Sequence, residues 1–76
     1  MPNTYAVDCY RRGTLVISAT QPTFLMARAE ALAFVRRELA GGDPMAAAYV
    51  RAAGSATVRF YRVFVNRAGR VQAQST

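Results

Sequence analysis

The chain of 76 residues contains no histidine and only one cysteine, and these absences exclude most familiar catalytic centres. Without histidine there is no Ser–His or Cys–His pair, and a lone cysteine lacks its commonest partner for binding zinc. Cys9 also has no second cysteine with which to form a disulfide within the chain. Because Cys9 alternates in phase with Tyr5 and Val7, we interpret it as a core residue rather than a reactive thiol.

Acidic residues are scarce, and lysine is absent. The carboxylates are Asp8, Glu30, Glu38 and Asp43, against ten arginines, and the net charge is +6. No two carboxylates are placed as general acid–base catalysis requires, so we predict a non-enzymatic protein with no metal and no cofactor. A GC-rich coding sequence accounts for the missing lysine. The net charge itself favours an anionic partner: nucleic acid, a nucleoprotein or an acidic protein surface.

Long apolar runs are missing too. None approaches the roughly 18 to 20 residues of a membrane span, and the segment "MPNTYAVDCY" lacks the pattern of a signal peptide. We therefore expect a soluble cytoplasmic protein without a membrane partner, forming one domain over residues 1–76. A chain of this size buries only about 60% of its unfolded surface, so a homodimer is an open alternative.

The N-terminal part of the chain is predicted to form a β-hairpin. Residues 4–11 and 14–20 carry the alternation and the β-branched side chains of strands. Between them, Gly13 can take the positive φ that a short hairpin turn requires.

The segment "QPTFLMARAEALAFVRREL" (21–39) is predicted to be the main helix. Its apolar residues fill about half of a helical wheel. Pro22 suits its first turn, and either Gly41 or Gly42 is expected to end it in a left-handed conformation.

A second, short helix is predicted in "PMAAAYVRAA" (44–53). Asp43 is expected to cap it, with Pro44 at its first position and Gly54 at its end.

A second hairpin is predicted at residues 56–65 and 70–74. The intervening "NRAG" fits a type I turn opened by Asn66 and completed by Gly69 with positive φ. The predicted fold is an α+β two-layer sandwich. It has a four-stranded antiparallel sheet in β-β-α-(short α)-β-β order with the helices on one face.

The strand at 56–65 has two faces of unequal character. Val58, Phe60, Arg62 and Phe64 are the more core-like set, which makes Arg62 an exception that should reach past the sheet edge or meet a partner. The opposite, open face would then present the following residues: Tyr10, Arg12, Arg59, Tyr61 and Arg70. Such a face can stack bases and neutralise phosphates, but it is also ordinary for a solvated sheet.

A further basic group lies in the two turns. If both hairpins point the same way, four arginines meet at one end of the sheet. The complete set of candidate binding residues is Tyr10, Arg11, Arg12, Arg59, Tyr61, Arg62, Arg67 and Arg70.

This small, basic, histidine-free chain resembles anti-CRISPR proteins of phages and mobile elements. The likeness is one of hairpin–helix–hairpin architecture over the whole chain. It is carried by "YRRGT", "LMARAEALAFVRREL" and "VRFYRVFVNRAGRV", without a diagnostic motif. The resemblance implies a stoichiometric inhibitor that acts in the host bacterial cytoplasm. It would bind a protein or nucleoprotein complex, such as a CRISPR–Cas effector complex, and block nucleic-acid engagement. The alternative is a basic module that binds DNA or RNA directly on its open face.

Overall fold

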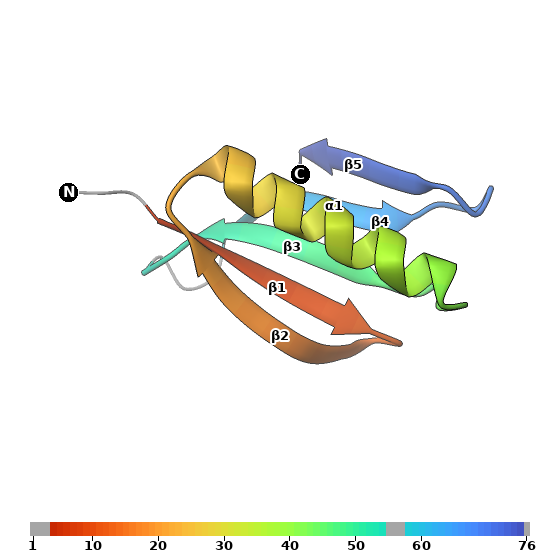
Figure 1. The fold of residues 1–76 in the computed structure, drawn as a ribbon. Helices are drawn as coiled ribbons and strands as arrows, with labels where there is room; N and C mark the ends of the chain where they lie inside the picture. The colour runs from red at the N-terminus through yellow and green to blue at the C-terminus, as the bar shows by residue number, and fades with distance from the viewer. Residues whose placement is uncertain (1–3, 55–57, 76) are drawn as a thin grey trace.

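The structure is a computed structural model that describes residues 4–54 and 58–75. Within these residues, five strands form one antiparallel sheet and a single helix lies across one face of it (Figure 1). The elements are β1 (Tyr5–Arg11), β2 (Thr14–Gln21), α1 (Phe24–Ala40), β3 (Ala47–Ala52), β4 (Arg59–Val65) and β5 (Val71–Ser75). The strands lie side by side in the order β2-β1-β3-β4-β5. The short β5 is therefore an edge strand.

The predicted second helix is wrong, because residues 47–52 form the central strand β3. The sheet therefore has five strands rather than four, with one helix rather than two. In β3, Ala48 and Val50 are buried in the core while Tyr49 and Arg51 lie on the other face. An isolated helix of this length is marginal in water, whereas β3 is hydrogen-bonded to a strand on each side. Pairing on both sides thus overrides the helix propensity of alanine.

The main helix agrees with the prediction apart from its first residues. Thr23 is the N-cap, and its Oγ1 accepts a hydrogen bond from the Met26 N–H at 3.1 Å. Pro22 therefore precedes the cap instead of occupying the first turn. After the helix ends at Ala40, Gly42 adopts φ 97°, which confirms one of the two predicted left-handed stops.

Both predicted hairpin turns are present. In the β4–β5 turn, Gly69 has φ 78° and Asn66 Oδ1 accepts hydrogen bonds from the N–H groups of Ala68 and Arg70. In the β1–β2 turn, Arg12 and Gly13 have φ 52° and 82°. Positive φ at both central residues is the geometry that matches the twist of the flanking strands. The predicted start of the second hairpin at residue 56 lies outside the described residues.

The core between helix and sheet is built from small side chains. Ala27, Ala31, Phe34 and Val35 of α1 face a layer of buried residues on the sheet. That layer consists of Val7, Cys9, Ala48, Val50 and Val63. Such a core buries little apolar area for each residue, so the single chain has a modest margin of stability.

Several basic segments meet at one end of the sheet. The antiparallel registers place the β1–β2 turn and the β4–β5 turn at the same end, where α1 also finishes (Figure 1). The opposite end is closed by an aromatic cluster of Tyr5, Phe24, Phe60 and Tyr61. In the described part of the chain, no helix is both long and apolar enough to cross a membrane.

Candidate binding face

An irregularity in the pairing between β3 and β4 determines the face of the sheet on which each β4 side chain lies. Val50 pairs with Tyr61, but Arg51 pairs with Arg59, so Phe60 is an extra residue between them. Such a β-bulge re-aims the side chains that follow it. As a result, Arg59 and Arg62 lie on the same face although they are three residues apart.

The predicted face assignment is correct for Arg59 and Phe60, but it is wrong from Tyr61 onward. Tyr61 was expected on the open face, but its ring contacts Phe24 edge-to-face with centroids 5.2 Å apart. Its hydroxyl accepts a hydrogen bond from Arg28 Nε at 3.0 Å, on the helix side of the sheet. Phe64, expected in the core, lies instead with Arg62 on the face that no described helix covers. Thr57, which belongs to the strand predicted at 56–65, lies outside the described residues.

Asp8 is the centre of an ion-pair network on this uncovered face. It is only 4% exposed and accepts hydrogen bonds from Ser18 Oγ at 2.8 Å and from Arg51 Nε at 2.9 Å. Arg59 Nη2 lies 3.5 Å from the same carboxylate. Burial alone disfavours the charged form, but the hydrogen bonds from Arg51 and Ser18 and the two arginine charges outweigh it. They hold the pKa of Asp8 below its ordinary value.

Arg59 is held between two aromatic rings. Its guanidinium carbon lies 4.5 Å from the ring centroid of Tyr49 and 5.2 Å from that of Tyr10. Its Nη2 also donates a hydrogen bond to the Tyr10 hydroxyl. The two tyrosines contact each other edge-to-face. Arg59 thus covers both rings, and its position is fixed by cation–π contacts as well as by Asp8.

Arg62 lies near the middle of the same face, between Tyr49 of β3 and Gln74 of β5. Its guanidinium carbon is 4.5 Å from the ring centroid of Phe64. The Arg62 Nε is buried and has no hydrogen-bond partner among the described residues. The prediction that placed Arg62 in phase with the core is wrong. Arg62, which the sequence marked as an exception, is nevertheless unusual in the structure because of this unpaired Nε donor.

We call this surface the open face and define it by the following residues: Asp8, Tyr10, Tyr49, Arg51, Arg59, Arg62, Phe64, Gln72 and Gln74. This face carries three arginines and one carboxylate, which forms ion pairs with Arg51 and Arg59, so the face is cationic. Sequence reasoning missed Tyr49 and Arg51 because their segment was predicted to be helical. The alternation of Ala48 and Val50 with Tyr49 and Arg51 was the signal that could have placed them.

The four arginines of the two turns lie at the same end of the sheet. The β1–β2 turn is toward the β2 edge of the sheet, and the β4–β5 turn is toward the β5 edge. Arg11 is engaged by Glu38, with Nε–Oε1 and Nη2–Oε2 distances of 2.7 and 3.1 Å. This bidentate hydrogen bond lowers the pKa of Glu38. Arg12, Arg67 and Arg70 are exposed. This end is thus a secondary basic surface rather than one cluster.

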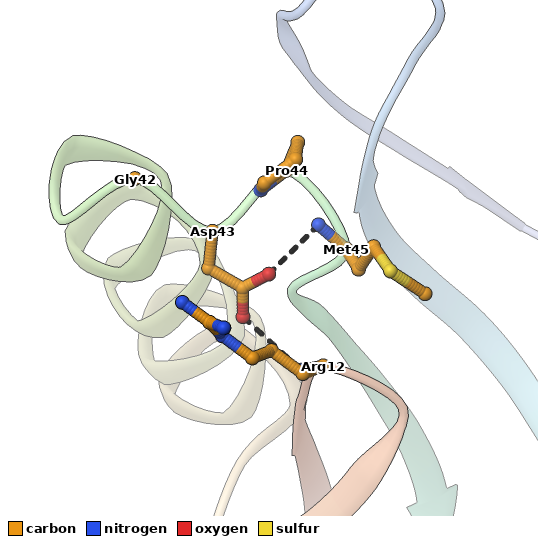
Figure 2. Close-up of a pocket in the computed structure, with 5 residues that line it drawn as sticks. All are labelled: Arg12, Gly42, Asp43, Pro44 and Met45. Carbon is orange, nitrogen blue, oxygen red and sulfur yellow. Dashed lines mark hydrogen bonds between the residues drawn. The ribbon is translucent and has the colours of Figure 1, made fainter.

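Asp43 joins two loops at this end instead of capping a helix. Its Oδ2 accepts a hydrogen bond from the Arg12 N–H at 3.1 Å, and its Oδ1 accepts one from the Met45 N–H at 2.9 Å (Figure 2). The surrounding pocket, of about 240 Å³, is lined by Arg12, Gly42, Asp43, Pro44 and Met45. Because both oxygens of the buried carboxylate are used to hold the loops, we assign the site a structural role.

Cys9 lies in the core beneath α1, as predicted. Burial, reinforced by the negative charges of Glu30 and Asp8, raises the pKa of its thiol to about 11. The thiol is therefore neutral and shielded in the folded protein. No three histidine, cysteine, aspartate or glutamate side chains gather to hold a metal ion within residues 4–54 and 58–75.

Comparison with known protein families, with curated proteins and with solved structures found no match. The open face and its chemistry therefore provide the structural indication of function. Guanidinium groups that lie over aromatic rings can donate paired hydrogen bonds to carboxylates or phosphates. The arrangement is suited to binding an anionic surface.

Proposed function

We propose that this protein is a non-enzymatic binding protein that engages an anionic macromolecule through its open face. The observation that carries the proposal is the pair of ring-stacked arginines, Arg59 and Arg62, on a sheet face with one carboxylate. Following its resemblance to anti-CRISPR proteins, we propose a bacterial CRISPR–Cas nucleoprotein complex as the partner. Binding would be stoichiometric and would block the complex from engaging nucleic acid.

A protein or nucleoprotein partner suits the aromatic geometry better than a bare single strand. Base stacking requires an accessible ring face, and Arg59 lies over the rings of both Tyr10 and Tyr49. Arginine and tyrosine in a packed, partly desolvated cluster are also typical of protein-interface hot spots. Carboxylates or phosphates that bind at Arg62 would offer acceptors to a donor that has no partner in the described part of the chain.

Direct nucleic-acid binding is the second candidate, and the net charge of +6 favours it. Its affinity would fall steeply with salt, because each phosphate contact releases condensed counterions. A gel-shift series with single-stranded and double-stranded DNA and RNA tests this candidate. The absence of binding even at low salt eliminates it.

The leading proposal is tested first in cells. A bacterial strain whose CRISPR–Cas system blocks a phage is transformed with this gene, and phage plating efficiency is measured. We expect plating to be restored by the natural protein and lost with Arg62→Gln. Arg36→Gln removes one exposed positive charge from α1, outside the open face, and serves as the matched control. Equal restoration of phage plating by both variants would show that Arg62 is not needed, and the open face would no longer be proposed as the binding surface.

A pull-down from the same strain then identifies the partner. The tagged protein is incubated with lysate that has or has not been treated with nuclease, and bound proteins are identified by mass spectrometry. Retention of CRISPR–Cas subunits after nuclease treatment supports direct protein contact. Recovery of no effector subunit, with no restored plating in strains that carry different CRISPR–Cas types, overturns the proposal.

A further inference from the structure

The edge strand β2 exposes an unusual amount of apolar surface. Leu15, Val16 and Ile17 are 49%, 42% and 40% exposed, and they follow one another directly in the chain. Three of the seven large hydrophobic residues that are exposed in the described structure lie here. The other edge strand, β5, presents no large exposed hydrophobic residue in its described part.

The backbone of β2 is also unpaired along one side. Within residues 4–54 and 58–75, β2 pairs only with β1, so alternate N–H and C=O groups point away from the sheet. Natural edge strands usually avoid pairing through charged side chains, proline, a covering segment or a bulge. β2 has a bulge at Val16, but its sequence "TLVISATQ" contains neither charge nor proline.

The absence of charged residues in β2 indicates what kind of strand can pair with this edge. The chain carries +6 overall, which opposes contact between two copies at most of its surface. At β2, however, two neutral and apolar strands can meet without bringing arginines directly together. We therefore propose that two copies of this chain pair through β2, antiparallel, around a two-fold axis perpendicular to the sheet.

This symmetry also brings opposite charges together at both ends of the interface. In an antiparallel pair, the Thr14 end of one β2 lies beside the Gln21 end of the other. The first end carries the Arg12 turn. The second holds Glu30, whose Oε1 accepts a hydrogen bond from Gln21 Nε2 at 2.6 Å. Each copy thus places a basic turn beside an acidic residue of its partner, and a closed two-fold contact repeats this arrangement twice.

The pairing has a consequence for partner binding, and this consequence rests on the proposed function. A two-fold axis perpendicular to the sheet keeps both helices on one side and both open faces on the other. The dimer would therefore display one ten-stranded sheet with two sets of Arg51, Arg59 and Arg62. Two linked sites bind a repeating or symmetric anionic partner more tightly than one site does.

Sedimentation equilibrium of the purified protein tests the pairing. We expect a concentration-dependent mass approaching twice the 8.3 kDa of the chain. Ile17→Lys places two like charges in the interface and should weaken the dimer by about a hundredfold or more. Gln74→Lys adds the same charge to the β5 edge and should leave the dimer intact. Both variants are checked for folding by far-UV circular dichroism.

Hydrogen exchange on the unaltered protein gives a second readout that does not depend on any variant. Amides of β2 should exchange more slowly at high protein concentration, while those of β5 should not change. A monomer at every concentration overturns the proposal, as does a dimer that persists in folded Ile17→Lys. Capture of a foreign strand on β2 by an otherwise monomeric protein also overturns it. Arg62→Gln should leave the dimer unchanged, so failure of the pairing can be told apart from failure of the open face.

Discussion

Replacing Asp8 with asparagine tests the ion-pair network that organises the open face. The asparagine keeps the shape of the side chain, but it loses the charge that faces Arg51 and Arg59. One of its two acceptor oxygens also becomes an N–H₂ donor directed at donor groups. Because Asp8 is 4% exposed, water cannot reach its side chain to replace the interactions lost there.

The size of the effect follows from the burial of the three groups. Removing one partner of a fully buried ion pair costs about 3–5 kcal/mol. The side chains of Arg51 and Arg59 are 24% and 37% exposed, so solvent recovers part of that cost. We therefore expect Asp8→Asn to lower the free energy of unfolding by about 2–3 kcal/mol at pH 7. For a domain of this size, that is a fall of about 8–24 °C in Tm.

Urea unfolding followed by far-UV circular dichroism, repeated across pH, measures this loss and its sign. The pKa of Asp8 is lowered in the folded state from 3.8, so the network stabilises the fold above about pH 4. That contribution is lost as pH falls through the lowered pKa. The gap between the natural protein and Asp8→Asn should therefore be full at pH 7 and shrink toward pH 2. A gap below about 0.5 kcal/mol at pH 7, or one that does not change with pH, would refute the reasoning.

Two further predictions concern the core and the loops. With a pKa of about 11, roughly 0.1% of the Cys9 thiol is ionised at pH 8, so it should react with a thiol reagent far more slowly in the folded protein than in urea. Equal rates would contradict its burial. Asp43→Ala removes the acceptors of the Arg12 and Met45 N–H groups and should lower the free energy of unfolding by about 1–3 kcal/mol, measured by urea unfolding. An unchanged midpoint would show that these loops do not depend on the carboxylate.

The elements that could be predicted from the sequence are those whose signals are local. The turn at Asn66 and Gly69 is specified by residues within five positions of one another, and it forms as expected. The same holds for the hairpin at Gly13 and for the helix that ends before Gly42. Each of these signals acts within a few residues of the backbone it shapes, so no knowledge of the rest of the fold is needed.

The features that could not be predicted depend on strands far apart in the chain. β3 forms because β1 and β4 pair with it on both sides. The alternation within "PMAAAYVRAA" is compatible with a strand, but it does not identify the strands that pair with it. The face reached by Arg62 depends on the extra residue at Phe60, which exists only relative to the register of β3. A shift of one residue exchanges the two faces of a strand. For that reason Arg59, which precedes the extra residue, lies on the face predicted for it, whereas Tyr61, which follows it, does not. Tyr10 of β1 also lies on its predicted face.

Arg62 gives the sharpest test of whether the open face is shaped for binding rather than for stability. A buried donor without a partner costs about 1–3 kcal/mol, while stacking on Phe64 returns about 0.5–1 kcal/mol. Arg62→Met removes the unpaired Nε and keeps an unbranched side chain that can lie on the ring. We therefore expect the free energy of unfolding to be unchanged or to rise by up to about 1 kcal/mol, and partner recovery in the pull-down to fall. Such a result identifies Arg62 as a residue retained at a cost to the fold. A clear loss of stability in Arg62→Met would instead mean that the guanidinium stabilises the sheet. The main structural observation in favour of a binding role for the open face would then be refuted.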